Sequence, residues 1–225
     1  MKISIITTAY NEEMNVPLFY GSLKKALAGI DYELVFVNDG STDRTLAEIK
    51  KIKDERVRII SEDRRGKSFA LYNGLQNAKN EIIATIDSDL QDDASDIPKL
   101  INKLSKGYDF VCGWRYERKD GIVKKISSKI GNLFLKIFFS IYLHDNNCPL
   151  KVFKKECVQN ILFFEHFHRF LTVLAKIQGY KVGEEKVRHY PRKYGKSKYG
   201  IRNRMLGNFK TILMIKFRKE GIFKN

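Results

Sequence analysis

The chain has 225 residues, a formal net charge of +16 and 43% hydrophobic residues. A chain of this length can bury one substantial core, so we expect one compact domain with a C-terminal extension and not two independent domains. The N-terminus has no signal-peptide pattern, and no apolar run reaches the roughly 20 residues that span a bilayer, which argues against a secreted or membrane-spanning protein.

The positive charge is concentrated in the second half of the sequence. Residues 1–105 hold 15 Lys/Arg and 17 Asp/Glu, whereas residues 106–225 hold 27 and 9. This asymmetry indicates an anionic partner for the second half: a membrane surface, a phosphorylated substrate or nucleic acid, with simple solubility as the alternative. The three cysteines are odd in number and lack metal-ligand spacing, which is typical of a reducing cytosol and gives no zinc site.

The first ninety residues alternate between strand and helix patterns. Apolar, β-branched runs predict strands at residues 3–8, 33–37, 57–60 and 82–86, and apolar residues spaced by three and four predict helices between them. This alternation indicates βαβ units and a parallel sheet.

A polar cluster follows each of these strands, at residues 9–13, 38–43, 63–68 and 87–91. In parallel α/β sheets, ligands bind beyond the carboxyl ends of the strands, so we expect the four loops to converge on one crevice. In the last loop, the carboxylates of Asp87 and Asp89 can reach one hard divalent cation, with the Gln91 carbonyl as a further oxygen ligand. A polar turn is the alternative reading of that loop.

The second half changes character after a strand expected at residues 108–113. Residues 130–143 are apolar with Lys136 as the only charge, and they predict a helix that is either buried or lies in a membrane interface. Further strands are expected at residues 150–153 and near 181–183. The helix predicted between them carries an aromatic stripe that is expected in the core: Phe163, Phe164, Phe167 and Phe170.

The C-terminal segments are basic. Residues 190–200 are rich in Lys, Arg, Gly and Tyr and predict a mobile loop that wraps phosphate. Residues 201–219 set apolar side chains among Lys and Arg, which is typical of a cationic amphipathic helix. We therefore divide the chain into a main domain, residues 1–200, and a cationic segment, residues 201–225.

Three motifs at expected strand ends resemble family 2 inverting glycosyltransferases. They are residues 8–13 (TAYNEE), 37–43 (VNDGSTD) and 87–91 (DSDLQ). Within that family the chain is similar to the dolichyl- and polyprenyl-phosphate sugar transferases, of the dolichol-phosphate mannose synthase type. The resemblance continues through residues 113–115 (GWR), 168–170 (HRF) and the RxxGxSKY pattern at 192–199, so it covers about residues 1–200.

The resemblance implies a GT-A-like α/β fold, with a mainly parallel central sheet flanked by helices and one cleft for a GDP- or UDP-linked sugar. It implies that Asp87, Asp89 and Gln91 hold Mg²⁺ or Mn²⁺, and that Asp87, Asp89 and Arg192 are catalytic. The substrate-binding residues that it implies are Ala9, Tyr10, Glu12, Asp39, Arg65, Gly66, Lys67, Arg115, Arg169, Ser197 and Lys198.

The acceptor decides which chemistry the cleft must supply. Negative charge on a leaving diphosphate is stabilised by a divalent cation acting as a Lewis acid and by cations such as Arg192 and Lys198. A sugar-hydroxyl acceptor also requires a general base, for which Asp89 or another carboxylate would serve. A polyprenyl phosphate, with a second pKa near 6, is already a nucleophile at neutral pH and requires only cations to hold it.

We therefore expect sugar transfer from a nucleoside diphosphate sugar to a polyprenyl phosphate. Transfer to a saccharide hydroxyl of a surface polysaccharide or lipid-linked oligosaccharide is the alternative, and a non-catalytic basic nucleotide- or nucleic-acid-binding protein is a remote one. No nucleic-acid-binding motif is present, so no nucleic-acid partner is expected. His168 fits either a structural or a functional role.

Membrane attachment is the remaining question. Many bacterial relatives continue into a pair of transmembrane helices that this sequence lacks. We expect either a longer natural chain or peripheral attachment on the cytoplasmic face of an anionic membrane. Burial of the apolar segments in the fold or in a homodimer is the alternative.

Overall fold

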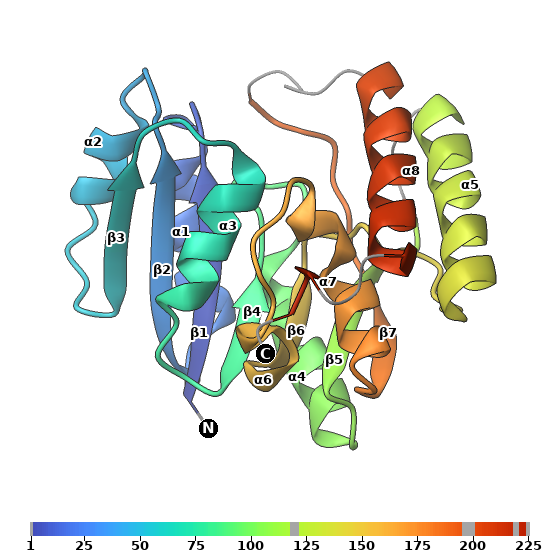
Figure 1. The fold of residues 1–225 in the computed structure, drawn as a ribbon. Helices are drawn as coiled ribbons and strands as arrows, with labels where there is room; N and C mark the ends of the chain where they lie inside the picture. The colour runs from blue at the N-terminus through green and yellow to red at the C-terminus, as the bar shows by residue number, and fades with distance from the viewer. Residues whose placement is uncertain (1, 118–121, 195–200, 218–220, 224–225) are drawn as a thin grey trace.

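The apolar runs of the sequence form a seven-stranded sheet in this computed structural model, which describes residues 2–117, 122–194, 201–217 and 221–223 (Figure 1). The spatial order is β3-β2-β1-β4-β6-β5-β7, and neighbouring strands run parallel except where β6 pairs antiparallel with β4 and β5. The strands are β1 (Lys2–Ala9), β2 (Asp31–Asp39), β3 (Val57–Glu62), β4 (Ile82–Thr85), β5 (Phe110–Arg115), β6 (Lys151–Lys154) and β7 (Val182–Val187). The predicted α/β class with a mainly parallel sheet is confirmed.

Helices cover both faces of the sheet. They are α1 (Val16–Ala26), α2 (Thr45–Lys50), α3 (Lys67–Gln76), the short 3-10 helix η1 (Ala94–Asp96), α4 (Ile97–Ser105), α5 (Ile122–Phe139), α6 (Glu156–Gln159), α7 (Phe167–Ile177) and α8 (Ile201–Phe217). Alternate side chains of β2 divide between the two layers, as the period of two in a strand requires. Leu34 and Phe36 belong to the core layer with α1, α2 and α4, whereas Val35 and Val37 belong to the layer with α3 and α7.

The order of the strands in the sheet determines where the crevice lies. Strands β2 and β3 lie on one side of β1, and β4 lies on its other side, so the chain reverses its direction of travel across the sheet at β1. In doubly wound sheets, ligands bind at this point, beyond the carboxyl ends of the two central strands. Residues 9–13 follow β1 and residues 87–91 follow β4, so these two loops, which both carry acidic side chains, meet there.

The aromatic helix begins later than its pattern predicts. Helix α7 starts at Phe167, because His166 at its N-cap adopts a left-handed backbone with φ of 69° and ends the preceding turn. Phe163 therefore lies before the helix, where its ring packs edge-on against Phe69 at 5.3 Å. Phe167 and Phe170 are buried, so the expectation that this stripe belongs to the core is confirmed for the helical part.

Helices α5 and α8 lie side by side on one flank of the molecule, where α5 also contacts α7 (Figure 1). The rings of Phe134 and Phe209 meet at 5.5 Å, and Leu135 and Ile215 are buried beneath. Within the described ranges, none of the helices combines the length and the apolar character that a bilayer crossing requires.

Candidate active site

Backbone and hydroxyl contacts join the loops that follow β1, β2 and β4. The amide of Asn11 donates to Ser41 Oγ at 3.0 Å, and the amide of Glu12 donates to Thr45 Oγ1 at 2.7 Å. Ser88 Oγ donates to the carbonyl of Thr8 at 3.0 Å. These loops therefore converge on one crevice, as predicted. Hydrogen bonds within the chain hold them together without a bound ligand.

Asp39 fixes the loop that precedes α3. Its buried carboxylate accepts from the backbone amides of Arg65 and Gly66, both at 2.9 Å, and forms an ion pair with Arg64. The Arg64 guanidinium also stacks on the ring of Tyr10, 3.4 Å from its centre. Gly40 permits the close approach of the Arg64 backbone, because a Cβ at position 40 would lie 2.4 Å from the Arg64 backbone nitrogen.

Asp87 and Asp89 lie together directly after β4, and each meets a cation. Lys67 Nζ lies 2.7 and 2.5 Å from the two carboxylate oxygens of Asp87. Arg192 forms an ion pair with Asp89, and its other nitrogen lies 3.1 Å from Glu12 Oε1. Burial, and then the neighbouring charge of Asp87, raise the pKa of Asp89 to about 6, against the opposing effect of the two cations.

The donor set at this edge suits a hard divalent cation. The charge of Asp87 contributes to the raised pKa of Asp89, and a dication bound at both carboxylates would relieve this repulsion. Gln91 is held in the same loop, since its backbone amide donates to Asp89 Oδ1 at 3.1 Å. The described part of the chain contains no cluster of three or more His, Cys, Asp or Glu with metal-site spacing. Magnesium usually takes only one or two protein carboxylates together with substrate phosphates, so a two-carboxylate site fits it.

Arg115 is bound to an acidic partner. Its guanidinium donates to the two oxygens of Asp145 at 2.6 and 3.0 Å, and 9% of its side chain is exposed. Asp92 is buried nearby, and this burial raises its pKa to about 7 although Arg115 opposes the shift. Arg115 thus lies at the carboxyl end of β5 as expected. No local sequence pattern predicts that Asp145 is its partner.

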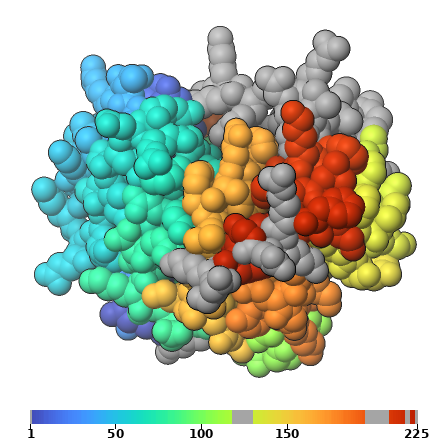
Figure 2. Space-filling model, viewed as in Figure 1, coloured from blue at the N-terminus to red at the C-terminus, as the bar shows by residue number. Residues whose placement is uncertain are grey.

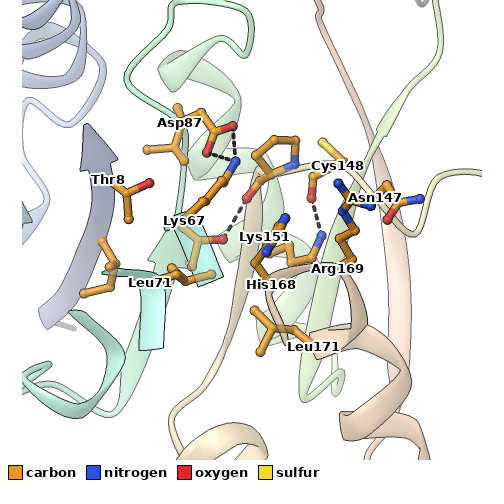
Figure 3. A pocket seen from close by; sticks show the side chains of 14 residues that line it. Thr8, Lys67, Leu71, Asp87, Asn147, Cys148, Lys151, His168, Arg169 and Leu171 are labelled. Atoms are coloured by element: carbon orange, nitrogen blue, oxygen red, sulfur yellow. Dashed lines mark hydrogen bonds and ion pairs between the residues drawn. The ribbon is translucent and has the colours of Figure 1, made fainter. Parts of the chain in front are cut away.

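His168 and Arg169 lie in the first turn of α7, in the same helical layer as α3, and line a pocket together with Lys67 and Asp87 (Figure 3). His168 Nδ1 lies 2.7 Å from Ser68 Oγ, in the first turn of α3. Burial and the cations Lys67 and Arg169 lower the pKa of His168 well below its ordinary value, so its imidazole is neutral at pH 7. The predicted residues Ser197 and Lys198 lie outside the described residues.

Sequence reasoning gave no role to three side chains of the site, Arg64, Ser68 and Lys151. The first two do lie in the polar cluster at residues 63–68 that was expected at the crevice. Arg64 stands beside the predicted Arg65, whose own side chain stacks on Phe69 instead. Lys151 is buried in β6 with 2% exposure. Its one signal was a charged side chain at an inward position of an otherwise apolar strand.

Known proteins are similar to this chain in sequence and in fold. A dodecaprenyl-phosphate galacturonate synthase of Rhizobium johnstonii is 33% identical over 211 residues, 89% of this chain and 62% of that protein. An undecaprenyl-phosphate 4-deoxy-4-formamido-L-arabinose transferase of Pseudomonas aeruginosa is 30% identical over 204 residues, 88% of this chain and 60% of that protein. The chain thus spans less than two thirds of the length of these curated relatives.

Solved structures give the same architecture at lower identity. The glucosyl-3-phosphoglycerate synthase of Mycobacterium tuberculosis, in complex with Mn²⁺, uridine diphosphate and phosphoglyceric acid, superposes with a TM-score of 0.74 at 18% identity, over 96% of this chain and 78% of that chain. The GT-A-like fold expected from the motifs is therefore confirmed. The Glycosyl transferase family 2 profile matches residues 4–171. These residues include the loops that carry Asp39, Asp87 and Asp89, and the chain belongs to glycosyl transferase family 2.

Proposed function

We propose that this chain transfers a sugar from a GDP- or UDP-linked donor to a polyprenyl phosphate, with Mg²⁺ or Mn²⁺ as cofactor. Two relatives that align over nearly nine tenths of the chain carry dodecaprenyl phosphate and undecaprenyl phosphate in their names, which supports the acceptor class. Their names differ in the sugar, galacturonate in one and 4-deoxy-4-formamido-L-arabinose in the other.

One observation supports a phosphate acceptor over a hydroxyl acceptor. The cleft carboxylates are engaged by cations: Asp39 by Arg64, Asp87 by Lys67 and Asp89 by Arg192. Each of these contacts would have to be given up before the carboxylate could accept a proton from a hydroxyl acceptor. An acceptor that arrives as a phosphate dianion needs no base. The ion pairs of the cleft thus favour an acceptor that arrives already charged.

The residues then divide by task. Ala9, Tyr10, Glu12, Asp39 and the Arg65–Gly66 backbone form the nucleotide side, where buried Asp39 keeps the loops in place.

Asp87, Asp89 and Gln91 would hold the divalent cation, which supplies Lewis-acid stabilisation of the leaving diphosphate when bound. Lys67 and Arg192 already stand at these carboxylates, so they are placed to contact the diphosphate oxygens as charge builds there. Arg115, Arg169, Ser197 and Lys198 remain our candidates on the acceptor side.

Helix α5 supports peripheral attachment to the cytoplasmic face of an anionic membrane. Ile130, Leu133 and Ile137 form one stripe along it, and they are 40%, 56% and 64% exposed. Figure 2 shows α5 and α8 as adjoining strips on one flank of the molecule. An exposed apolar stripe on a basic half of a protein suits an interface with anionic lipid.

A transfer assay tests the proposal. The chain is incubated with labelled UDP- and GDP-sugars and either undecaprenyl phosphate, undecaprenol or a soluble oligosaccharide, with Mn²⁺ or with EDTA. The proposal expects lipid-linked product only with the phosphate and the metal. Product on the oligosaccharide but not on the lipid phosphate would instead support the hydroxyl-acceptor alternative.

A further inference from the structure

Four side chains form a compact surface cluster near the carboxyl ends of β5 and β7. The rings of Trp114 and His144 stack with their centres 4.0 Å apart, and the ring of Tyr116 makes a T-shaped contact with the indole at 5.1 Å. Lys186 lies over the Tyr116 ring, 4.1 Å from its centre, and is paired with Trp114 in the register of the two parallel strands. We call Trp114, Tyr116, His144 and Lys186 the aromatic platform.

The platform faces solvent although three of its four members are aromatic. Tyr116 is 57% exposed and the side chain of His144 is 61% exposed, while Trp114 is half-buried. Glu184 holds the imidazole in place: its Oε2 accepts from the backbone amide of His144 at 2.8 Å, and its Oε1 meets the ring nitrogen Nδ1. The chain itself therefore braces the platform, which is not a loose group of surface side chains.

The connection after α5 links the platform to the exposed apolar stripe of that helix. It runs back along α5, since Lys136 lies over the ring of Tyr142 at 5.3 Å and Asn132 Nδ2 donates to the carbonyl of His144 at 2.6 Å. Tyr142 is 71% exposed. Lys136 follows Leu133 of the stripe by three residues, so the two side chains are neighbours on the helix surface. The stripe, Tyr142 and the platform thus form one continuous face.

The composition of this face suits the interfacial layer of an anionic bilayer. Tryptophan and tyrosine favour the level of the lipid head groups, because one part of each side chain is apolar and the other can hydrogen-bond with water. Lysine places its aliphatic stem in the same layer and its ammonium against the lipid phosphates. Residues 114–125 hold five basic and two acidic residues, so the sequence around Tyr116 keeps the positive sign that attracts anionic lipid.

A saccharide is the rival ligand for exposed aromatic rings. It would need an open ring face together with a few polar groups that fix its hydroxyls. His144 covers a face of the indole, and both carboxylate oxygens of Glu184 are engaged by His144. These contacts favour the membrane over a saccharide.

We propose that the aromatic platform docks at the head-group level of an anionic membrane when the chain is attached through α5. The inference rests on the peripheral attachment proposed above, and it adds an orientation. Strands β4 and β5 run in the same direction, because each is antiparallel to β6. Tyr116 after β5 and Asp87 after β4 therefore lie at the same edge of the sheet, so docking of the platform brings the edge that carries the crevice to the lipid surface.

The single tryptophan of the chain allows a direct test. The full chain is mixed at low salt with vesicles of phosphatidylcholine and phosphatidylglycerol whose acyl chains carry bromine either near the head group or near the bilayer centre. Bromine quenches an indole that lies at its depth, and co-sedimentation gives the bound fraction. The control chain combines Trp114→Phe with Leu18→Trp, which moves the tryptophan to an exposed position on α1, in the core layer opposite to that of α5.

We expect the emission of Trp114 to shift to shorter wavelength on vesicle binding and to be quenched more by the shallow bromine than by the deep one. The tryptophan of the control chain should keep its emission although that chain sediments with the vesicles. Lys186→Ser should weaken vesicle binding about fivefold, the effect of one basic residue at the surface. Lys24→Ser, the charge-matched change on α1, should weaken it less than about twofold.

Three results would overturn the proposal. A chain that sediments with vesicles while Trp114 stays unquenched would remove the platform from the interface and leave attachment through α5. A chain that does not bind anionic vesicles at low salt would remove both. Emission that responds to a soluble oligosaccharide and not to vesicles would identify the rival ligand.

The proposed function is tested separately, because transfer to undecaprenyl phosphate in detergent needs no membrane surface. Lipid-linked product without quenching of Trp114 would therefore remove the docked platform alone, and quenching without product would remove the transfer alone. If the control chain fails to unfold cooperatively, the comparison of Lys186→Ser with Lys24→Ser tests the same surface, since both lysines are exposed and neither change disturbs the core.

Discussion

The two halves of the chain use their charges in opposite ways. In residues 1–105 acidic and basic side chains are nearly equal in number, and two cleft carboxylates pair within that half, Asp39 with Arg64 and Asp87 with Lys67. Residues 106–225 carry three times as many basic as acidic side chains. Some of these bases reach across to the first half, where Arg192 meets Asp89 and Glu12.

This difference suggests a division of work between the halves. The acidic loops of the first half are fixed by backbone amides and hydroxyls, which preorganises them for a metal and a nucleotide. The second half supplies the cations that close onto them and an apolar surface on α5.

The largest effect should come from the first half. Asp89→Ala removes one of two carboxylates expected to hold the divalent cation, so kcat/KM for sugar transfer should fall about 1,000-fold or more. The fold should persist, because this carboxylate lies in a loop and not in a core layer. Activity with and without Mn²⁺, together with thermal unfolding, measures both expectations. Asp63→Ala, an exposed loop carboxylate, is the control. Full activity of Asp89→Ala in EDTA would contradict the metal assignment.

The next effect tests the cation that crosses between the halves. Arg192→Ala should weaken donor diphosphate binding about 10- to 100-fold, because charge-assisted contacts to phosphate are lost. Asp89 would also lose its ion-pair partner. Titration with UDP and GDP in Mg²⁺ measures the affinity, and Lys193→Ala controls for the charge change. If affinity and kcat/KM both stayed at wild-type values, Arg192 would contribute only to the unliganded structure.

The sequence predicted the donor side better than the acceptor side. Strand periodicity and the convergence of parallel strand ends are local or topological rules, so the loops at Asp39 and Asp87 could be placed together in advance. The antiparallel direction of β6 and the pairing of Arg115 with Asp145 depend on contacts distant in sequence. A local sequence pattern does not specify which of the many acidic residues forms an ion pair with a buried arginine.

The same limit explains the missed lysine and the late helix start. In the sequence, Lys151 is a single charged residue in a short predicted strand. Its burial beside a cavity becomes evident only in the assembled sheet with α7 packed against it. The start of α7 depends on the left-handed backbone of His166, which a stripe of phenylalanines does not encode. These positions lie where the second half folds back onto the first.

A third prediction weakens a contact between the halves that lies away from the chemistry. Asp96 has no exposed side-chain area, and it binds Arg188 through the backbone amide at 2.7 Å and the guanidinium at 3.0 Å. Asp96→Asn should lower the free energy of unfolding by about 2 kcal/mol at pH 7, because the partly exposed Arg188 reduces the loss below that of a fully buried pair. Urea unfolding measures it. Asp31→Asn, at an exposed pair with Lys2, should change stability by less than about 0.5 kcal/mol.

The pH dependence of this effect has a definite sign. Burial raises the pKa of Asp96, but hydrogen bonds from Arg188 and Lys99 outweigh it and leave the pKa below its ordinary value. A lowered pKa gives stability that is present above the unfolded value of about 4 and is lost as the pH falls. The stability difference between wild type and Asp96→Asn should therefore shrink between pH 5 and pH 3. A difference that grew toward low pH would contradict this pairing.

The smallest effect concerns the surface of the second half. Leu133 and Ile137 are exposed on α5, so the double change Leu133→Ser and Ile137→Ser should leave the fold intact and reduce vesicle binding by several-fold, since each side chain is only partly transferred into lipid. Co-sedimentation with anionic and neutral vesicles measures it. Leu18→Ser, an exposed leucine on α1 in the acidic half, should change nothing.

Salt separates the charge of this surface from its apolar stripe. Each basic residue near an anionic bilayer contributes about 1 kcal/mol, and that attraction fades beyond a Debye length of about 8 Å at physiological ionic strength. Wild-type binding to anionic vesicles should therefore weaken steeply with salt, while the loss caused by the serine variant persists at every salt concentration, because apolar burial is not screened. If the wild-type chain did not bind anionic vesicles at low salt, even with a polyprenyl phosphate present, the excess charge of the second half would serve the substrates alone. The exposed stripe on α5 would then require a protein partner, and a concentration-dependent dimer in sedimentation would be the next observation to seek.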